Sequence, residues 1–217
     1  MLDKICVKET EMMNLNSIRR IGFTVAVAMG TVGCALAQNA DDVLKKTVST
    51  LKSAKAATIS YAYQAGGDAG NGTISIKGKK FVNKMPGQTV WFNGKTMWTL
   101  VKANEEVNVT TPTAAQAAAM NPYGFLSLYK NGYAAKMTSS TKTEYVVTLT
   151  PKGKDKQTVT LHINRMSYLP SSVKMKHASA GDVAITVKSF KKHPTLSDGL
   201  FSFNPKAFPQ YEVIDLR

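Results

Sequence analysis

Short stretches in which apolar and polar residues alternate recur through most of this chain, and they limit its fold more than any other feature. In Val183-Ala184-Ile185-Thr186-Val187, for example, every second residue is large and apolar. Successive side chains of a β-strand point to opposite faces of the sheet. The pattern therefore predicts an antiparallel sheet with one apolar face and one face in contact with water.

The alternating stretches fall into two blocks. Asn93-Gly94 lies between apolar flanks within the first block, and this dipeptide is typical of a β-hairpin. We expect about ten or eleven strands, punctuated by turn residues at short intervals. They lie near residues 59–63, 74–76, 80–85, 89–92, 97–101 and 107–110 in the first block and 145–149, 159–163, 173–175 and 183–187 in the second.

Two segments have helical spacing instead. Residues 41–55 predict an amphipathic helix, and its apolar stripe consists of Val43, Leu44, Val48 and Leu51. Between the strand blocks, residues 113–120 are rich in alanine, and a further helical pattern runs from Asn121-Pro122 to Tyr129. The order predicts an α+β chain, mainly β, in which one large curved sheet has two helical segments available to cover its concave side.

The first 37 residues have the composition of an export signal. A basic pair, Arg19-Arg20, precedes the uncharged apolar stretch 21–36, and Ala35-Leu36-Ala37 ends it. This order is that of a cleavable secretory signal, and we expect cleavage after Ala37. An uncleaved anchor helix is the alternative, but the apolar stretch is shorter than the ~20 residues of a membrane span.

Two details of this segment leave alternatives open. Residues 1–11 precede the usual signal layout, so that Met12 or Met13 is a plausible start and 1–11 an extension that is not translated. Cys34 follows Thr31-Val32-Gly33, which partly resembles the site of a lipidated cysteine, although Thr31 stands where leucine is usual. Lipidation at Cys34 would anchor the protein, whereas cleavage after Ala37 would release it.

Cleavage after Ala37 would remove both cysteines of the chain, Cys6 and Cys34. A disulfide framework, a cysteine-ligated metal and a thiol nucleophile are then excluded from the mature chain. Residues 38–217 are enough for a single domain held by its own core, because a chain of this size buries ~70% of its unfolded surface. We therefore expect one domain over 38–217.

The charge is strongly basic, with a formal net value of +14 for the whole chain. Such a charge favours an anionic membrane surface or an acidic protein as partner. Nucleic acid is not expected, because export removes the opportunity and only two arginines, Arg165 and Arg217, follow the signal. Recognition of phosphates and bases usually depends on the fork geometry of arginine.

The titratable residues do not suggest an enzyme. The three histidines, His162, His177 and His193, are scattered, and none has a second ligand at metal spacing. His162 and His177 occupy polar positions of predicted strands, where solvated side chains are expected. Acid–base pairs and glycine-rich phosphate loops are also missing from the sequence. We expect no catalytic residue, no metal and no cofactor, and a hydrolase is the unsupported alternative.

Large apolar residues, in contrast, gather in two places. Trp91, Met97 and Trp98 flank the predicted hairpin, and Phe125, Leu128 and Tyr129 belong to the helical segment between the blocks. Each residue by itself is explained by an ordinary core. Together with a curved sheet and covering helices, they predict an apolar cavity for a ligand. We expect these six residues to line the cavity or its lid.

Two motifs resemble those of a known family. Residues 91–100, Trp-Phe-Asn-Gly-Lys-Thr-Met-Trp-Thr-Leu, with the strand 104–109, resemble the hairpin and following strand of the periplasmic lipoprotein carrier LolA. The segments 201–206, Phe-Ser-Phe-Asn-Pro-Lys, and 212–215, Glu-Val-Ile-Asp, resemble the end of that family's chain. The order and spacing of the motifs extend the resemblance over 38–217.

The resemblance implies an unclosed (half) β-barrel with helices over its concave apolar face. It implies a monomeric periplasmic chaperone for lipoprotein sorting, which takes acylated lipoproteins from an inner-membrane release complex to an outer-membrane acceptor. Hiding one acyl chain of ~16 carbons is worth roughly 12 kcal/mol at ~0.8 kcal/mol per methylene. Only a broad apolar cavity can compete with a membrane for such a chain.

One departure leaves related functions open. The family's carriers have an arginine on an early strand that holds the lid closed, but residues 58–85 contain none. Lys77, Lys79 or Lys80 are the candidate replacements, although lysine lacks the guanidinium fork. Relatives of this fold include periplasmic sensors that bind a regulatory protein and anchored outer-membrane lipoprotein receptors. These two functions are the alternatives to a carrier.

Overall fold

A computed structural model describes residues 39–121, 132–153, 157–176 and 181–217. Residues 37–217 form one compact unit. The expected export signal and the segment 122–131, with Phe125, Leu128 and Tyr129, lie outside the described residues.

Helix α1 (Ala40–Ser53) begins where the amphipathic stripe predicts it. The Asn39 side chain accepts a hydrogen bond of 2.8 Å from the backbone N–H of Asp42, which satisfies one of the free donors of the first turn. Val43 and Leu44 are buried on one side of the helix. The second helix, α2 (Ala114–Ala119), is short. Among the described residues, no helix has the length and apolar character that crossing a membrane requires.

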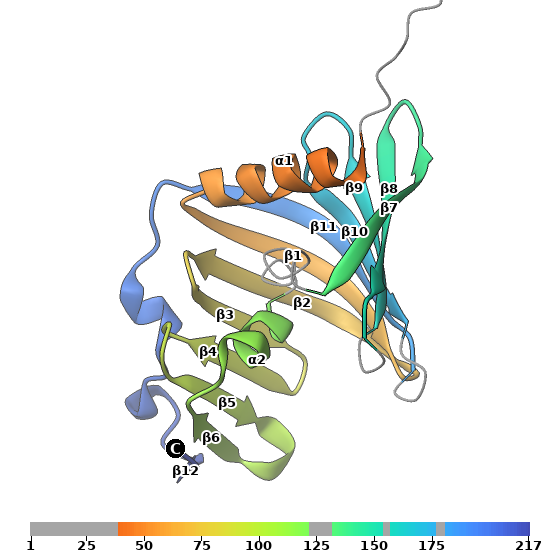
Figure 1. The fold of residues 1–217 in the computed structure, drawn as a ribbon. Helices are drawn as coiled ribbons and strands as arrows, with labels where there is room; N and C mark the ends of the chain where they lie inside the picture. Colours follow the sequence, from red (N-terminus) through yellow and green to blue (C-terminus); the bar gives the residue numbers. More distant parts are fainter. Residues whose placement is uncertain (1–38, 122–131, 154–156, 177–180) are drawn as a thin grey trace, which may run out of the picture. The chain divides into compact units, whose positions relative to one another are not determined.

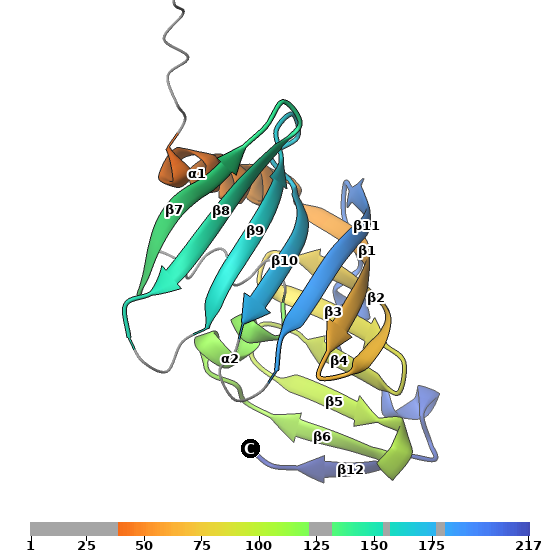
Figure 2. The same ribbon diagram turned by 90° about the vertical axis from the view of Figure 1, so that its right-hand side faces the viewer.

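The described residues form a single sheet of twelve strands (Figures 1 and 2). The order across the sheet is β12-β6-β5-β4-β3-β2-β1-β11-β10-β9-β8-β7. The strands are β1 (Ala56–Ala65), β2 (Asp68–Lys77), β3 (Lys80–Met85), β4 (Gln88–Phe92), β5 (Met97–Val101), β6 (Glu106–Thr110), β7 (Tyr133–Ser140), β8 (Glu144–Pro151), β9 (Thr158–Asn164), β10 (Pro170–Lys176), β11 (Val183–His193) and β12 (Glu212–Asp215).

This arrangement confirms the expected fold class, an unclosed and mainly antiparallel sheet accompanied by helices. Two strands go beyond the sequence pattern. In β7, small and polar residues blur the alternation, and the strand is identified by its pairing with β8. Strand β12 pairs with β6 in parallel. The C-terminal segment leaves β11, passes the strands β3 to β5 and only then joins the edge of the sheet as β12 (Figure 1).

The two faces of the sheet follow from the strand register. We call the face on which α1 and α2 pack the inner face and the opposite one the outer face; the sheet curves around the side of the helices (Figures 1 and 2). Val43 and Leu44 of α1 belong to a buried cluster with residues of β8, β9 and β10. Ala117 of α2 belongs to a second cluster with residues of β1 to β5. Both helices therefore bury their apolar sides on the inner face.

A third cluster lies on the outer face and is covered by the C-terminal segment. Phe201, which is fully buried, and Phe203 pack there against Trp91 and other residues of β3 to β6. The 3-10 helices η2 (Asp198–Phe201) and η3 (Pro205–Ala207) carry this segment. The segment therefore acts as a cover for one half of the outer face.

Lysines of the β2–β3 hairpin hold the C-terminal segment in place. The Nζ atoms of Lys77 and Lys80 lie 2.9 and 3.1 Å from the carboxylate of Asp198, and Lys77 also donates to the carbonyl of Leu196 at 2.8 Å. Hydrogen bonds from Lys77 and then Lys80 hold the pKa of Asp198 below its usual value. These two lysines are thus engaged by the C-terminal segment, which does not support their expected alternative role as replacements for a lid-holding arginine.

Candidate functional site

Apolar side chains of the inner face extend from β7 to β5. Its two clusters meet at Ile185 of β11, which packs against both of them. In the sheet, Ile185 lies beside Tyr63 of β1 on one side and Val173 of β10 on the other.

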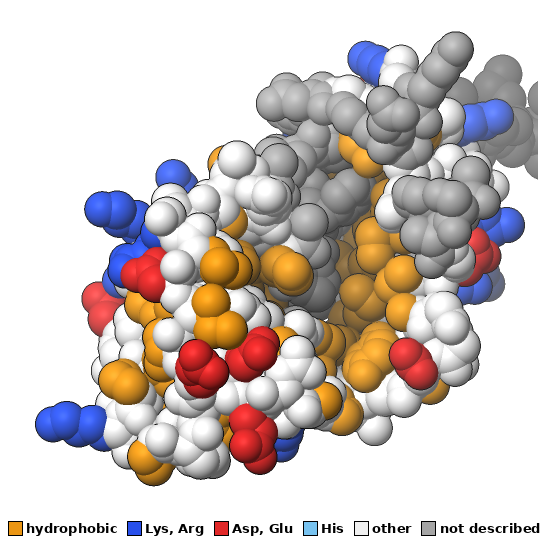
Figure 3. Space-filling model, turned by 90° about the horizontal axis from the view of Figure 1, so that it is seen from below, with side chains coloured by type: hydrophobic (Ala, Val, Ile, Leu, Met, Phe, Trp, Pro, Cys, Tyr) orange, Lys and Arg blue, Asp and Glu red, His pale blue; other side chains and the backbone are white. Residues whose placement is uncertain are grey.

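Part of this surface is not covered by the described residues. Figure 3 shows that the molecule is hollowed on the side seen from below and that hydrophobic side chains gather on the walls of the hollow. Half-buried inner-face residues that pack against the two clusters are Tyr63, Ile76, Met85, Tyr133, Ala135, Met137, Met175, Ile185, Val187 and Phe190. These side chains have apolar surface left to offer a ligand, and such a surface is what long hydrocarbon chains require.

A buried polar pair interrupts the apolar inner face. The hydroxyl of Tyr61 donates a hydrogen bond of 2.6 Å to Oδ1 of Asn83, and the two residues are only 4% and 6% exposed. Burial raises the pKa of Tyr61, against the opposing effect of the bond to Asn83. Tyr61 therefore stays neutral and keeps its proton for Asn83 at physiological pH.

Glycines of β2 make room for the tyrosine rings. A Cβ atom at Gly72 would overlap the ring of Tyr61, and one at Gly70 would lie 2.8 Å from the hydroxyl of Tyr63. Both rings therefore lie flat across β2, which lets Tyr61 reach Asn83 on the far side of it. The absence of side chains at these two positions shapes the centre of the inner face.

Tyr61→Phe is expected to lower the free energy of unfolding by about 1–2 kcal/mol, because it leaves the buried Asn83 oxygen without its donor. Urea unfolding of the two proteins at neutral pH measures the difference.

The ionisation of Tyr61 adds a second test. Because the pKa of Tyr61 is raised in the folded protein, its contribution to the free energy of unfolding is complete below pH ~10 and is lost as the pH rises further. The unfolding free energy of the wild type should then fall more steeply above pH ~10 than that of the variant, and parallel curves would contradict this account.

The structure separates the three expected site residues that it describes. Met97 lies on the inner face in the cluster that contains Ala117 of α2. Trp91 and Trp98 are cross-strand partners in the β4–β5 hairpin, and both pack in the cluster on the outer face. Figure 1 shows this hairpin beneath α2. Phe125, Leu128 and Tyr129 lie outside the described residues, so their contribution stays a prediction.

Trp91 is surrounded by aromatic rings of the C-terminal segment. Its ring centroid lies 5.5 Å from that of Phe203 and 5.7 Å from that of Phe208, both at steep angles. Edge-to-face packing of this kind stabilises a buried aromatic cluster. The expectation that Trp91 and Trp98 line the cavity is therefore not supported by their position; they hold the C-terminal cover, and Met97 alone of the three faces the side of the helices.

Strand alternation could have made this separation from the sequence. Trp91 and Phe92 are neighbours in β4 and so must point to opposite faces, and the hairpin pairs Trp91 with Trp98 and Phe92 with Met97. Because these large residues are neighbours along the chain, the sequence by itself does not show that they divide between the inner and the outer face. The same alternation in β1 and β11 places Tyr63, Ile185 and Val187 on the inner face, although they lie outside those clusters of large residues.

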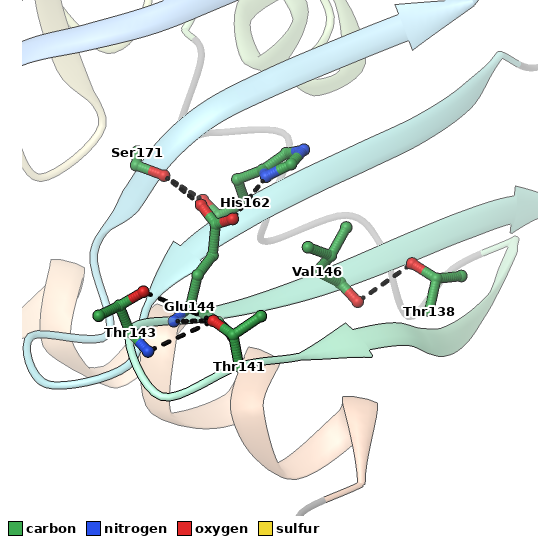
Figure 4. A network of polar contacts seen from close by, with 7 residues as sticks. All are labelled: Thr138, Thr141, Thr143, Glu144, Val146, His162 and Ser171. Carbon is green, nitrogen blue, oxygen red and sulfur yellow. Dashed lines mark hydrogen bonds and ion pairs between the residues drawn. The ribbon is translucent and has the colours of Figure 1, made fainter.

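A polar network on the outer face contains the residue types of a catalytic site but not its arrangement (Figure 4). Glu144 stands in the centre: its Oε2 lies 3.0 Å from Nδ1 of His162, and its Oε1 accepts from the Ser171 hydroxyl at 3.2 Å. A nucleophilic serine needs the imidazole beside its own hydroxyl, whereas here the carboxylate lies between them. The network joins β8, β9 and β10 and offers no activated nucleophile.

Two further features of the described chain offer no alternative site. Among the residues that the structure describes, no three His, Cys, Asp or Glu side chains gather as a metal site would require. A shallow pocket of about 480 Å³ lies at the ends of β1, β2 and β11, lined by Ala62, Tyr63, Gln64, Ala69, Gly70, Asn71, Ala184 and Thr186. Most of its side chains are small and neutral and belong to the outer face, and Tyr63 and Gly70 are its lining residues from the inner face.

The comparisons with known proteins identify the family. A family model described as outer membrane lipoprotein carrier protein LolA matches residues 31–179. The match covers more than half of the chain, and the chain therefore belongs to this family of lipoprotein carriers. A comparison with curated proteins gave no match.

Solved structures are similar to this chain at low sequence identity. An uncharacterized conserved protein from Thermus thermophilus has a TM-score of 0.56 at 10% identity, over 81% of this chain and 98% of that one. A LolA superfamily protein from Nitrosomonas europaea has a TM-score of 0.43 at 14% identity, over 76% and 98%. The complex of MucA and MucB from Pseudomonas aeruginosa includes a chain with a TM-score of 0.43 at 11% identity, over 81% and 63%.

Proposed function

We propose that this protein is a periplasmic carrier that shields the acyl chains of lipoproteins on its inner face while they pass from the inner to the outer membrane. The observation that carries the proposal is the extended, largely apolar inner face, whose two clusters meet at Ile185 and which the described residues leave partly uncovered. Membership of the lipoprotein carrier family supports the ligand class that we propose for this surface.

The apolar inner face is extensive enough to offset the free energy of removing an acyl chain from a membrane. Removing a chain of ~16 carbons from a membrane costs roughly 12 kcal/mol at ~0.8 kcal/mol per methylene. Burial at about 25 cal/mol per Å² requires several hundred Å² of apolar contact to offset this cost. Such an area can come from strands β1 to β11 together but not from the shallow pocket on the outer face.

The proposed ligand contacts combine described and undescribed residues. Met97, Ile185 and Val187 are the described contacts that we propose, since all three belong to or pack against the inner-face clusters. Phe125, Leu128 and Tyr129 are proposed as further contacts from the segment between α2 and β7. Export through cleavage after Ala37 would deliver the protein to the periplasm as a diffusing monomer, and its positive charge would favour approach to anionic headgroups.

A transfer experiment tests the proposal. Vesicles that contain a fluorescent, acylated lipopeptide are incubated with the purified chain 38–217, and the two are separated by size-exclusion chromatography. The proposal expects the lipopeptide to leave the vesicles with the protein, and a non-acylated version of the same peptide not to bind. Capture of both peptides alike would instead favour a sensor that recognises protein. An intact mass that includes lipid on Cys34, measured on protein expressed with its own signal, would favour an anchored receptor.

A further inference from the structure

The inner face changes from apolar to polar across the sheet. On β8, β9 and β10 its buried positions are all apolar, among them Val147, Leu161 and Val173. Towards the other edge of the sheet, polar side chains share the inner face with Val90, Phe92 and Met97. We call these polar side chains the polar wall; they are Gln88 on β4, Thr99 on β5, and Glu106 and Asn108 on β6.

The register places the polar wall on the inner face. Thr99 lies opposite Val90 of the inner-face cluster, and Asn108 lies opposite Thr99. Gln88 and Glu106 both pair with Val101, two residues further along β5. All four polar residues are only half-buried. On β8 to β10 the buried side chains of this face are all apolar, whereas on β4 to β6 hydrogen-bonding groups lie beside apolar ones.

Asn83 stands at the boundary between the two parts. It lies on β3, between Ile74 of β2 and Val90 of β4, and so in the same row across the sheet as Thr99 and Asn108. The bond from Tyr61 occupies its amide oxygen, whereas the amide nitrogen carries two N–H donors of its own. A donor in apolar surroundings gains most from an acceptor that arrives with the ligand, because water is scarce there.

We propose that the inner face binds an acyl ligand in one orientation, with the end of the chain over β7 to β10 and the carbonyl and polar head beside Asn83 and the polar wall. This inference rests on the proposed function. The chemical class is an acyl ester or amide whose head is neutral or cationic, since Glu106 is the charged member of the wall and Glu212 of β12 lies next to it. The reverse orientation would bury a polar head against apolar strands and leave a hydrocarbon end on the polar wall.

Photo-crosslinking tests the orientation. Two palmitoylglycerol probes carry a diazirine either beside the carbonyl or at the end of the chain, and the labelled peptides of chain 38–217 are mapped by mass spectrometry. We expect the carbonyl-side probe to label residues 83–110 and the chain-end probe to label residues 133–176. Equal or reversed labelling would overturn the orientation while leaving the carrier function intact. Failure of both probes to label in a saturable way would overturn the proposed function and this inference with it.

A variant tests the role of Asn83 without leaving Tyr61 unpaired. Tyr61→Phe serves as the reference protein, and Asn83→Leu is added to it, since replacing both partners of a buried hydrogen bond preserves the fold better than replacing one. We expect the addition to weaken binding of palmitoylglycerol about threefold to tenfold, and to leave binding of hexadecylglycerol, an ether without the carbonyl, unchanged. An equal change for the two ligands would overturn the role of Asn83.

Discussion

Ile185→Asp is expected to weaken the binding of a palmitoyl ligand by about 100-fold or more while the protein stays folded. Ile185 is the residue at which the two apolar clusters of the inner face meet, so a charge there interrupts the surface at its centre. Burying a carboxylate beneath an acyl chain costs at least several kcal/mol, and ~2.8 kcal/mol already corresponds to 100-fold in affinity. Fluorescence titration with a labelled fatty acyl probe measures the change.

The neighbouring residue provides the matched control. Thr186 follows Ile185 in β11 but points to the outer face, where it is exposed. Thr186→Asp introduces the same charge one residue away, and we expect it to leave the affinity within about twofold, because an exposed charge remains hydrated. Circular dichroism and thermal unfolding of both variants verify that they are folded. Similar affinities for Ile185→Asp and the wild type would show that the ligand does not cross the centre of the inner face.

Gly72→Ala is expected to lower the free energy of unfolding by about 2–3 kcal/mol, the upper range for an extra methyl group in a packed core. The new Cβ would overlap the ring of Tyr61, and that ring cannot move freely because it is buried and bonded to Asn83. The Tyr61 ring would have to move away from β2 or lose its hydrogen bond to Asn83. Urea unfolding of the variant and the wild type measures the loss.

Two other glycines calibrate this result. At Gly70 the added Cβ would lie 2.8 to 3.0 Å from the same end of the Tyr63 ring, compared with 2.4 to 2.8 Å for Tyr61 at Gly72. Tyr63 is only half-buried, so a smaller loss is expected. At Gly153 nothing lies within 4 Å of the added Cβ, and Gly153→Ala should change stability by no more than about 0.5 kcal/mol. A loss at Gly72 no greater than that at Gly153 would contradict the arrangement of the tyrosine rings.

Much of the sheet could be predicted from the sequence because alternation is a local property. Strand β3 (Lys80–Met85) begins and ends where its pattern does, and the Asn93-Gly94 turn joins β4 to β5 as expected. The helix stripe of Val43 and Leu44 likewise packs on the sheet. In each case, the residues of a single strand, turn or helix are sufficient to predict where the element lies and which of its side chains are buried.

The features that could not be predicted from the sequence depend on contacts between distant segments. Alternation separates Trp91 from Phe92, but nothing near Trp91 in the sequence indicates that Phe203 and Phe208 pack on it. The hydrogen bond between Tyr61 and Asn83 depends on the empty space over Gly72. The residue types do not indicate this contact, because it arises from the register in which β1, β2 and β3 pair. The candidate site is therefore a property of paired strands, and of the expected cavity residues that the structure describes, Met97 lies on the inner face.

The most direct test of a lipid-carrying inner face is native mass spectrometry of the chain exported with its own signal and purified gently from the periplasm. The account predicts a mature chain that begins at Gln38 and carries additional mass from an acylated protein or lipid, and it predicts that Ile185→Asp removes this mass while Thr186→Asp retains it. A ligand-free mass for the wild type, unchanged after incubation with acylated lipopeptide, would contradict the central claim.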